Sequence, residues 1–184
     1  MSRLFRLLIV SLLLPLAAGT ALARTEGGSG VRVGGWFSTK GSGVTLLFPH
    51  ADGSYGELRV SADFEQVLKG REKIPGIQAQ YRYNVRIGTV KLSDDFSIRP
   101  VGGPGISVGY VRDYGKDMGL LAALGGNLGL EFLFPASPLS IYAGFSAEIG
   151  AHIVLHDRYE SKMTLYSNGV RRVWQPELSV RYRF

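Results

Sequence analysis

Three side chains near the end of a long alternating segment are of the types that form hydrolytic triads. Ser146, Glu148 and His152 share one face if residues 139–153 form a strand. At ~3.3 Å per residue, His152 is ~13 Å from Glu148 and ~20 Å from Ser146, whereas a nucleophile and its base must lie within ~3 Å of each other. The spacing therefore argues against a triad, and we expect no catalytic residue and no enzymatic activity.

Two further groups of residues could hold a metal ion or a phosphate. His50, His156, Asp157 and Glu160 have suitable donor atoms, but the predicted topology separates them. The chain has no cysteine, which excludes a thiolate metal site and a disulfide framework. The glycines of residues 102–105 precede neither a Lys-Ser/Thr pair nor a helix, as a phosphate-binding loop would require. We therefore expect no metal and no cofactor.

The elements that must position these side chains are strands with a period of two. The last stretch, residues 173–184, shows the pattern most clearly. Its apolar face carries Trp174, Leu178, Val180, Tyr182 and Phe184. Its polar face carries Gln175, Glu177, Ser179, Arg181 and Arg183. Because successive strand side chains point to opposite faces, this pattern indicates a strand between hydrocarbon and a polar interior.

Seven earlier segments alternate in the same way, so the predicted count is eight. They cover residues 31–38, 44–48, 57–64, 77–87, 96–110, 118–134 and 139–153. The connection from Gly88 to Asp95 could extend either neighbouring strand, and the two prolines predict an irregular, bent segment from Pro100 to Pro104. The longest predicted loop runs from Leu155 to Arg172. The fold class that follows is all-β: an eight-stranded antiparallel up-and-down transmembrane β-barrel.

A soluble lipocalin-like barrel has the same period, but its apolar faces point inward. Two features favour the membrane alternative. The polar faces are rich in Gly and Ser, which suit a cramped lumen, and the apolar faces of the last five strands are almost free of charge. If the N-terminus starts in the periplasm, an even strand count places both termini there, and we then expect the 49–56 and 135–138 turns to face the periplasm. Aromatic residues near strand ends, including Phe96, Phe132 and Phe134, would form interfacial girdles.

The N-terminus has the form of an export signal. Arg3 and Arg6 precede an apolar run, and Ala21-Leu22-Ala23 resembles a signal-peptidase site. We expect residues 1–23 to be a signal peptide cleaved after export through the Sec pathway, and residues 24–184 to form one barrel domain. Removing the signal lowers the formal charge from +6 to 21 − 2 − 15 = +4. The basic residues are spread along strands, so we expect no nucleic-acid partner.

The signal, the eight alternating strands, the Gly102–Gly105 segment and the terminal Phe184 together resemble the small outer-membrane β-barrel superfamily, typified by the transmembrane domain of outer membrane protein A and by outer membrane protein X. The resemblance implies location in the outer membrane of a Gram-negative bacterium and contact with lipid and lipopolysaccharide. It also implies that the barrel-assembly machinery recognises Tyr182 and Phe184. The His-x-Ser pair that marks the lipid A deacylases of such barrels is missing.

The interior of an eight-stranded barrel is only wide enough for side chains to fill it. Buried charges persist when they are paired and hydrogen-bonded, so the inward-facing charges should form a salt-bridge network that blocks the bore. The expected members are Arg32, Glu57, Arg59, Asp63, Arg82, Arg86, Arg99, Glu131, Glu148, Glu177, Arg181 and Arg183.

These observations favour a structural or surface-interaction barrel, and two alternatives stay open. One is a narrow, porin-like pore that prefers anions because of its arginine excess; the other is a lipid A-modifying enzyme. The long loop offers a basic and aromatic surface for lipopolysaccharide phosphates or an unknown protein partner. Its candidate contacts are Arg158, Tyr159, Lys162, Tyr166, Arg171 and Arg172.

Overall fold

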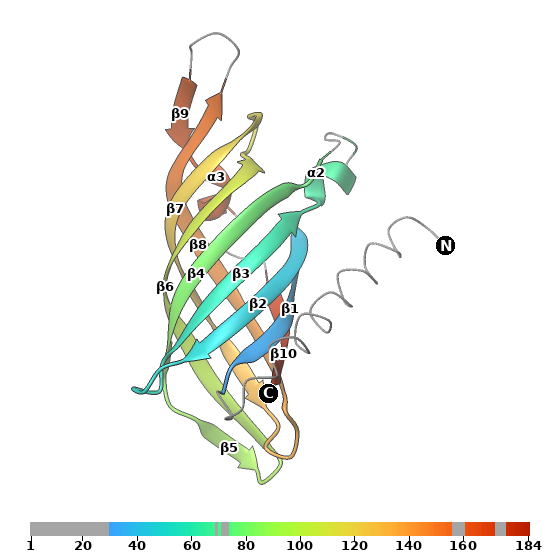
Figure 1. Ribbon diagram of the computed structural model, residues 1–184, viewed down its shortest axis with the longest axis vertical. Coiled ribbons are helices and arrows are strands. Elements are labelled where there is room, and N and C mark those ends of the chain that lie inside the picture. The colour runs from blue at the N-terminus through green and yellow to red at the C-terminus, as the bar shows by residue number, and fades with distance from the viewer. Residues whose placement is uncertain (1–29, 69, 71–73, 156–160, 172–175) are drawn as a thin grey trace, which may run out of the picture.

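The computed structural model describes residues 30–68, 70, 74–155, 161–171 and 176–184. The predicted signal peptide lies outside these residues. Ten strands and two short helices are assigned within them, and none of these helices is long and apolar enough to cross a bilayer. Figure 1 shows strongly tilted strands that wrap around a common axis.

Eight strands close into an antiparallel barrel, which confirms the predicted fold class. Each strand pairs with the next along the chain, and the last strand, β10, pairs with both β8 and β1, so the sheet has no open side. The strands of the barrel are β1 (Arg32–Ser38), β2 (Gly41–Pro49), β3 (Tyr55–Asp63), β4 (Gly76–Arg86), β6 (Phe96–Arg112), β7 (Met118–Leu133), β8 (Leu139–Leu155) and β10 (Glu177–Arg183).

Burial follows the predicted alternation. Outward residues such as Leu124 and Leu128 leave 65% and 63% of their surface exposed, whereas the inward residue Asn127 between them is buried. On the inward face of β2, Leu47 packs in a small cluster with Tyr55, Val101 and Tyr142. The centre of this molecule is therefore mostly polar and its outer surface mostly apolar.

The connections separate into two ends of the barrel. One end, which we call the α3 mouth, carries the 39–40 turn, helix α2 (Glu65–Leu68), the 113–117 turn, strand β9 (Ser161–Leu165) and helix α3 (Ser167–Arg171). The opposite end, the β5 mouth, carries the 50–54 turn, strand β5 (Val90–Ser93) and the chain terminus at Phe184 (Figure 1). The uncertain 88–95 connection thus contains a short strand, which pairs with β6.

The prediction of an irregular segment from Pro100 to Pro104 is wrong for the edge of β6 that pairs with β7. From Ser97 to Arg112, β6 pairs with β7 residue by residue without a change of register. On the β4 side, pairs are missing between Arg82–Gly105 and Val85–Gly102, but the register is the same before and after the gap. Proline cannot donate a ladder hydrogen bond, and continuous pairing along the other edge is enough to hold the strand.

The long connection after β8 is not a surface loop throughout. Strand β9 pairs with the end of β8, and the backbone amide of Tyr166 then donates to the carbonyl of Gly150 at 2.8 Å. Helix α3 follows and packs against β8, with Gly169 so close to the Glu148 backbone that a Cβ there would lie 2.3 Å from the Glu148 carbonyl oxygen. The connection therefore folds back into the α3 mouth.

Candidate functional site

The middle of the lumen is occupied by the carboxylate of Glu177. It lies 2.6 Å from Nη1 of Arg59 and 2.7 Å from Nη1 of Arg82. The indole nitrogen of Trp36 donates to it at 3.0 Å, and the Tyr142 hydroxyl at 3.3 Å. These partners come from β1, β3, β4 and β8, whereas Glu177 starts β10. One carboxylate thus joins five strands across the bore.

A second buried carboxylate, Glu57, extends this cluster toward the β5 mouth. It pairs with Arg59 at 3.0 Å and with Arg181 at 3.1 Å, and all three side chains are fully buried. The Arg181 guanidinium lies 4.6 Å from the centre of the Tyr142 ring. Burial of so many charges is tolerable because each guanidinium meets a carboxylate or an aromatic face.

Glu131 forms the layer nearest the β5 mouth. Arg32 pairs with it directly, Arg181 lies 3.6 Å away and Arg99 lies 3.7 Å away. Arg181 therefore bridges Glu57 and Glu131, so the two layers form one connected set of ion pairs. Arg32 and Arg99 keep 15% and 21% of their side-chain surface exposed, which marks the boundary with solvent.

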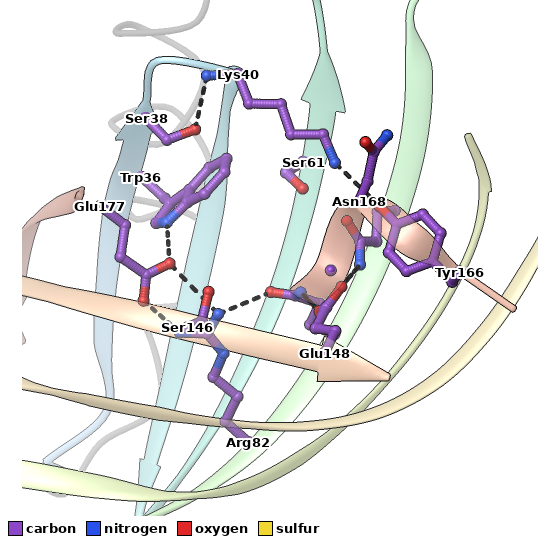
Figure 2. A pocket seen from close by; sticks show the side chains of 13 residues that line it. Trp36, Ser38, Lys40, Ser61, Arg82, Ser146, Glu148, Tyr166, Asn168 and Glu177 are labelled. Atoms are coloured by element: carbon purple, nitrogen blue, oxygen red, sulfur yellow. Dashed lines mark hydrogen bonds and ion pairs between the residues drawn. The ribbon is translucent and has the colours of Figure 1, made fainter. Parts of the chain in front are cut away.

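A polar cavity of about 70 Å³ lies on the α3 side of Glu177. Figure 2 shows Glu148 on one side of it and Glu177 with Arg82 on the other. The side-chain amides of Gln78 and Gln80 donate to the Glu148 carboxylate, Gln78 at 2.9 Å. A volume of this size holds a few water molecules but no organic substrate of ordinary size.

The segment that contains α3 lines this cavity on the side of the α3 mouth, through Tyr166, Asn168 and Gly169. The Asp113 carboxylate accepts hydrogen bonds from the backbone amides of Ser167 at 3.0 Å and Asn168 at 2.9 Å, and pairs with Lys116 at 2.7 Å. Tyr166, almost fully buried, receives a hydrogen bond from Lys40 Nζ at 3.2 Å (Figure 2). We call residues 165–170, held in this way, the lid.

Ion pairs join eight of the twelve predicted lumen residues into one set. The eight are Arg32, Glu57, Arg59, Arg82, Arg99, Glu131, Glu177 and Arg181. The other four lie apart from that set. Asp63 pairs with Lys40 at 3.3 Å, and Glu148 bonds to glutamines. Arg86 lies over the Tyr55 ring, with 5.5 Å from its Cζ to the ring centre, and makes no ion pair with a described residue. Arg183 is exposed at the end of β10.

The structure changes the expectation for the long loop. Tyr166, expected on the surface, is 1% exposed because the chain turns inward after β9. Lys162 is exposed on β9, as a surface contact requires. Arg158, Tyr159 and Arg172, together with the side chain of Arg171, lie outside the described part of the chain. Tyr182 and Phe184 face outward, with their rings 4.9 Å apart in an edge-to-face arrangement.

The three residues considered for a triad do not meet. His152 is fully buried, with Nε2 3.0 Å from the Val111 carbonyl oxygen and its ring beside Tyr166. Glu148 contacts Gln78 and Gln80 instead. Within the described residues no hydrogen bond connects Ser146, Glu148 and His152, and no group of three His, Cys, Asp or Glu side chains could hold a metal ion.

Several contributors to the lumen were not predicted as members of the network. Trp36, Gln78, Gln80 and Tyr142 all lie on the inward faces, so strand parity could have found them once uncharged donors were considered. Asp113 and Asn168 are different, because they lie in connections where the period of two gives no orientation. Only folding of the lid onto the 113–117 turn brings them into contact.

Comparison with known proteins shows little sequence similarity. No family model matches this chain, and no curated protein matches it. Among solved structures, the N-terminal β-barrel domain of Pseudomonas aeruginosa OprF is similar, with a TM-score of 0.49 and 10% identity, over 84% of this chain and 95% of that chain. The function of this chain must therefore be inferred from its own residues and their contacts.

Proposed function

We propose that this protein is an integral outer-membrane β-barrel with a structural or surface-interaction role, whose lumen is closed by side chains. The outward surface supports membrane insertion. It exposes a belt of large apolar side chains, of which Leu58, Val60, Ile106, Val108, Leu124, Leu128, Ile149 and Val180 are examples. A soluble monomer rarely exposes a continuous apolar surface of this extent, whereas a membrane barrel requires it.

The observation that supports closure is the connected set of ion pairs between Glu131 and Glu177. Arg59, Arg181 and Glu57 are fully buried in the middle of the bore, so water does not reach their charged groups. The lid narrows the cavity that remains on the α3 side. Two successive layers of side chains would have to move before an ion could pass.

Conductance in a planar bilayer tests this proposal. The purified protein, inserted from detergent, is expected to give no steady conductance steps, because no continuous water path crosses the ion-pair layers. Heat-modifiable migration in gel electrophoresis serves as the control that the inserted protein is folded. Regular unitary steps from the unmodified protein would contradict closure.

One observation favours a second candidate, a narrow pore that prefers anions. The lumen holds six arginines, Arg32, Arg59, Arg82, Arg86, Arg99 and Arg181, against the four carboxylates Glu57, Glu131, Glu148 and Glu177, a surplus of 6 − 4 = +2. A surplus of positive charge attracts anions to a constriction. If conductance is seen, a reversal potential measured across a KCl gradient decides between anion and cation preference.

A lipid A-modifying activity has less support. The inward-facing Glu148 and His152 are engaged by other groups, and lipid acyl chains lie on the outer side of the wall. Mass spectrometry of lipid A from strains with and without the gene tests this activity, and an unchanged lipid A profile is expected.

The proposed partners are lipopolysaccharide, the barrel-assembly machinery and an unknown protein at the α3 mouth. Lys162 is a described basic side chain exposed there, where it could meet a lipopolysaccharide phosphate. For assembly, Phe184→Ala is expected to slow insertion of the protein into membranes that contain the purified machinery, whereas Tyr110→Phe, an outward change elsewhere on the barrel, serves as a control. Equal insertion rates would contradict a role for the terminal aromatic.

A further inference from the structure

The β5 mouth concentrates positive charge beyond what its carboxylate neutralises. Arg32 and Arg99 both lie at Glu131, and Arg86 projects from the end of β4 onto the Tyr55 ring. Arg183 is the direct cross-strand partner of Arg32 in the β1–β10 pair. Arg32, Arg86 and Arg99 therefore share one inward-facing carboxylate, that of Glu131.

This arrangement is unfavourable without a further anion. Like charges placed directly opposite each other on neighbouring strands repel, as Arg32 and Arg183 do here. Arg86 is repelled by Arg99 and Arg32 and attracted by Glu131, but among the described residues no carboxylate is within ion-pair distance of it. Its Nε is buried and has no hydrogen-bond acceptor among the described atoms.

The mouth is also accessible. Arg32 and Arg99 are partly exposed, and Arg183 is exposed. The fully buried pair of Arg181 and Glu57 lies deeper in the bore, farther from the β5 mouth. Thr89 accepts a hydrogen bond from Nε of Arg99 at 2.9 Å, which holds this guanidinium at the rim while its Nη1 faces Glu131. Guanidinium groups bind phosphate through paired N–H donors, and several around one opening suit an anion with two charges.

We propose that the β5 mouth binds the phosphate group of an anionic ligand between Arg32, Arg86 and Arg99. The arginines line the inner side of the wall, so a phosphate compound dissolved in the compartment on this side has direct access. The stacked rings of Phe96 and Phe132 on the outer side, with centroids 6.2 Å apart, mark the level of a membrane interface. A phospholipid headgroup at that level is the other source of the same chemical group.

Phosphorus NMR on the protein purified in dodecyl maltoside tests the site, because that detergent contains no phosphate. Inorganic phosphate is the probe, titrated at constant ionic strength. We expect saturable broadening of its signal, and a loss of affinity of about tenfold or more in Arg86→Gln. This variant leaves no carboxylate unpaired, so it should fold as the unmodified protein does. Arg86→Lys keeps the charge but loses the paired donors, and should lie between the two.

Arg112→Gln at the opposite mouth removes the same charge from a partly exposed side chain and should leave phosphate binding unchanged. In a parallel titration, short-chain phosphatidylglycerol replaces inorganic phosphate. Arg86-dependent binding of either probe supports the site. The probe that binds shows whether the phosphate group comes from a dissolved compound or from a phospholipid headgroup. Absence of saturable binding for both probes, or equal affinity of the unmodified protein and Arg86→Gln, would overturn the proposal.

Discussion

Oε2 of Glu177 lies 2.6 Å from Nη1 of Arg59, a residue 118 positions earlier in the chain. Both side chains are almost completely withdrawn from solvent. The contact connects β10 with β3 through the centre of the barrel. It exists only when the sheet has closed, because the two strands are separated by β1 and β2 in the wall.

Glu177→Gln should be strongly destabilising. The substitution leaves Arg59 and Arg82 buried with one carboxylate fewer, and breaking such a pair typically costs about 3–5 kcal/mol. Urea unfolding in lipid vesicles, followed by tryptophan fluorescence, measures the loss. Asp117→Asn is the matched control, because Asp117 is 75% exposed and lies 3.9 Å from Arg112, and its removal should change stability by less than about 1 kcal/mol. Equal effects of the two substitutions would contradict a structural network.

Asp113→Asn should open the lid at neutral pH. The carboxylate is the shared acceptor for the amides of Ser167 and Asn168 and the partner of Lys116, and an amide side chain replaces it poorly. The chain has no cysteine, so Ala123→Cys supplies a unique thiol under Tyr166. Labelling of this thiol by a membrane-impermeant maleimide should become about tenfold faster or more with Asp113→Asn. Asp117→Asn in the same turn should leave the rate unchanged.

The lid should also loosen in acid. Burial of Asp113 opposes its charged form, but hydrogen bonds from Lys116 and from the amides of Ser167 and Asn168 outweigh it and hold the pKa below its usual range. A lowered pKa in the folded state means that the charged form stabilises the lid above the ordinary Asp value of about 3.9, and that this contribution is lost as pH falls below it. Amide NMR signals of Ser167 and Asn168 should shift together over that window. Unchanged signals down to pH 2 would contradict the role of the carboxylate.

Asp52, in the turn between β2 and β3, should have an unusually low pKa. The Ser54 hydroxyl donates to it at 2.5 Å, the Tyr83 hydroxyl at 2.8 Å and the Ser54 amide at 2.9 Å, and these bonds lower its pKa to about 2. Tyr83→Phe should raise this pKa toward 3.8. Carboxyl carbon NMR follows the titration directly. Tyr110→Phe, an outward tyrosine far from this turn, should not move the Asp52 midpoint.

Gly103→Ala should prevent normal closure between β4 and β6. A Cβ at position 103 would lie 1.8 Å from the Tyr83 carbonyl oxygen, so β4 and β6 would have to move apart at this point. At the neighbouring Gly126 the nearest atom to a Cβ is 3.2 Å away, so Gly126→Ala should be much milder. The fraction of heat-modifiable, folded protein after refolding into detergent measures both. Equal yields would show that the close approach is not required.

The faces of the strands could be predicted from the sequence because alternation is a local property. In β4 and β7 each residue has a defined side relative to its neighbours, so Arg82 and Glu131 were placed inward correctly without knowledge of any partner. The number of barrel strands follows from the same pattern, since each alternating segment is one crossing of the wall.

The tertiary structure alone decided which inward charges meet and what covers them. Register and closure determine that Arg59 reaches Glu177, that Arg86 reaches an aromatic ring, and that Arg183 projects into solvent. The lid has no periodic signal, and only the contact of Ser167 and Asn168 with the distant Asp113 turns a predicted surface loop inward. The period of two places a side chain on one face of a strand, but the position of that strand around the barrel is set by pairing between segments far apart in the chain.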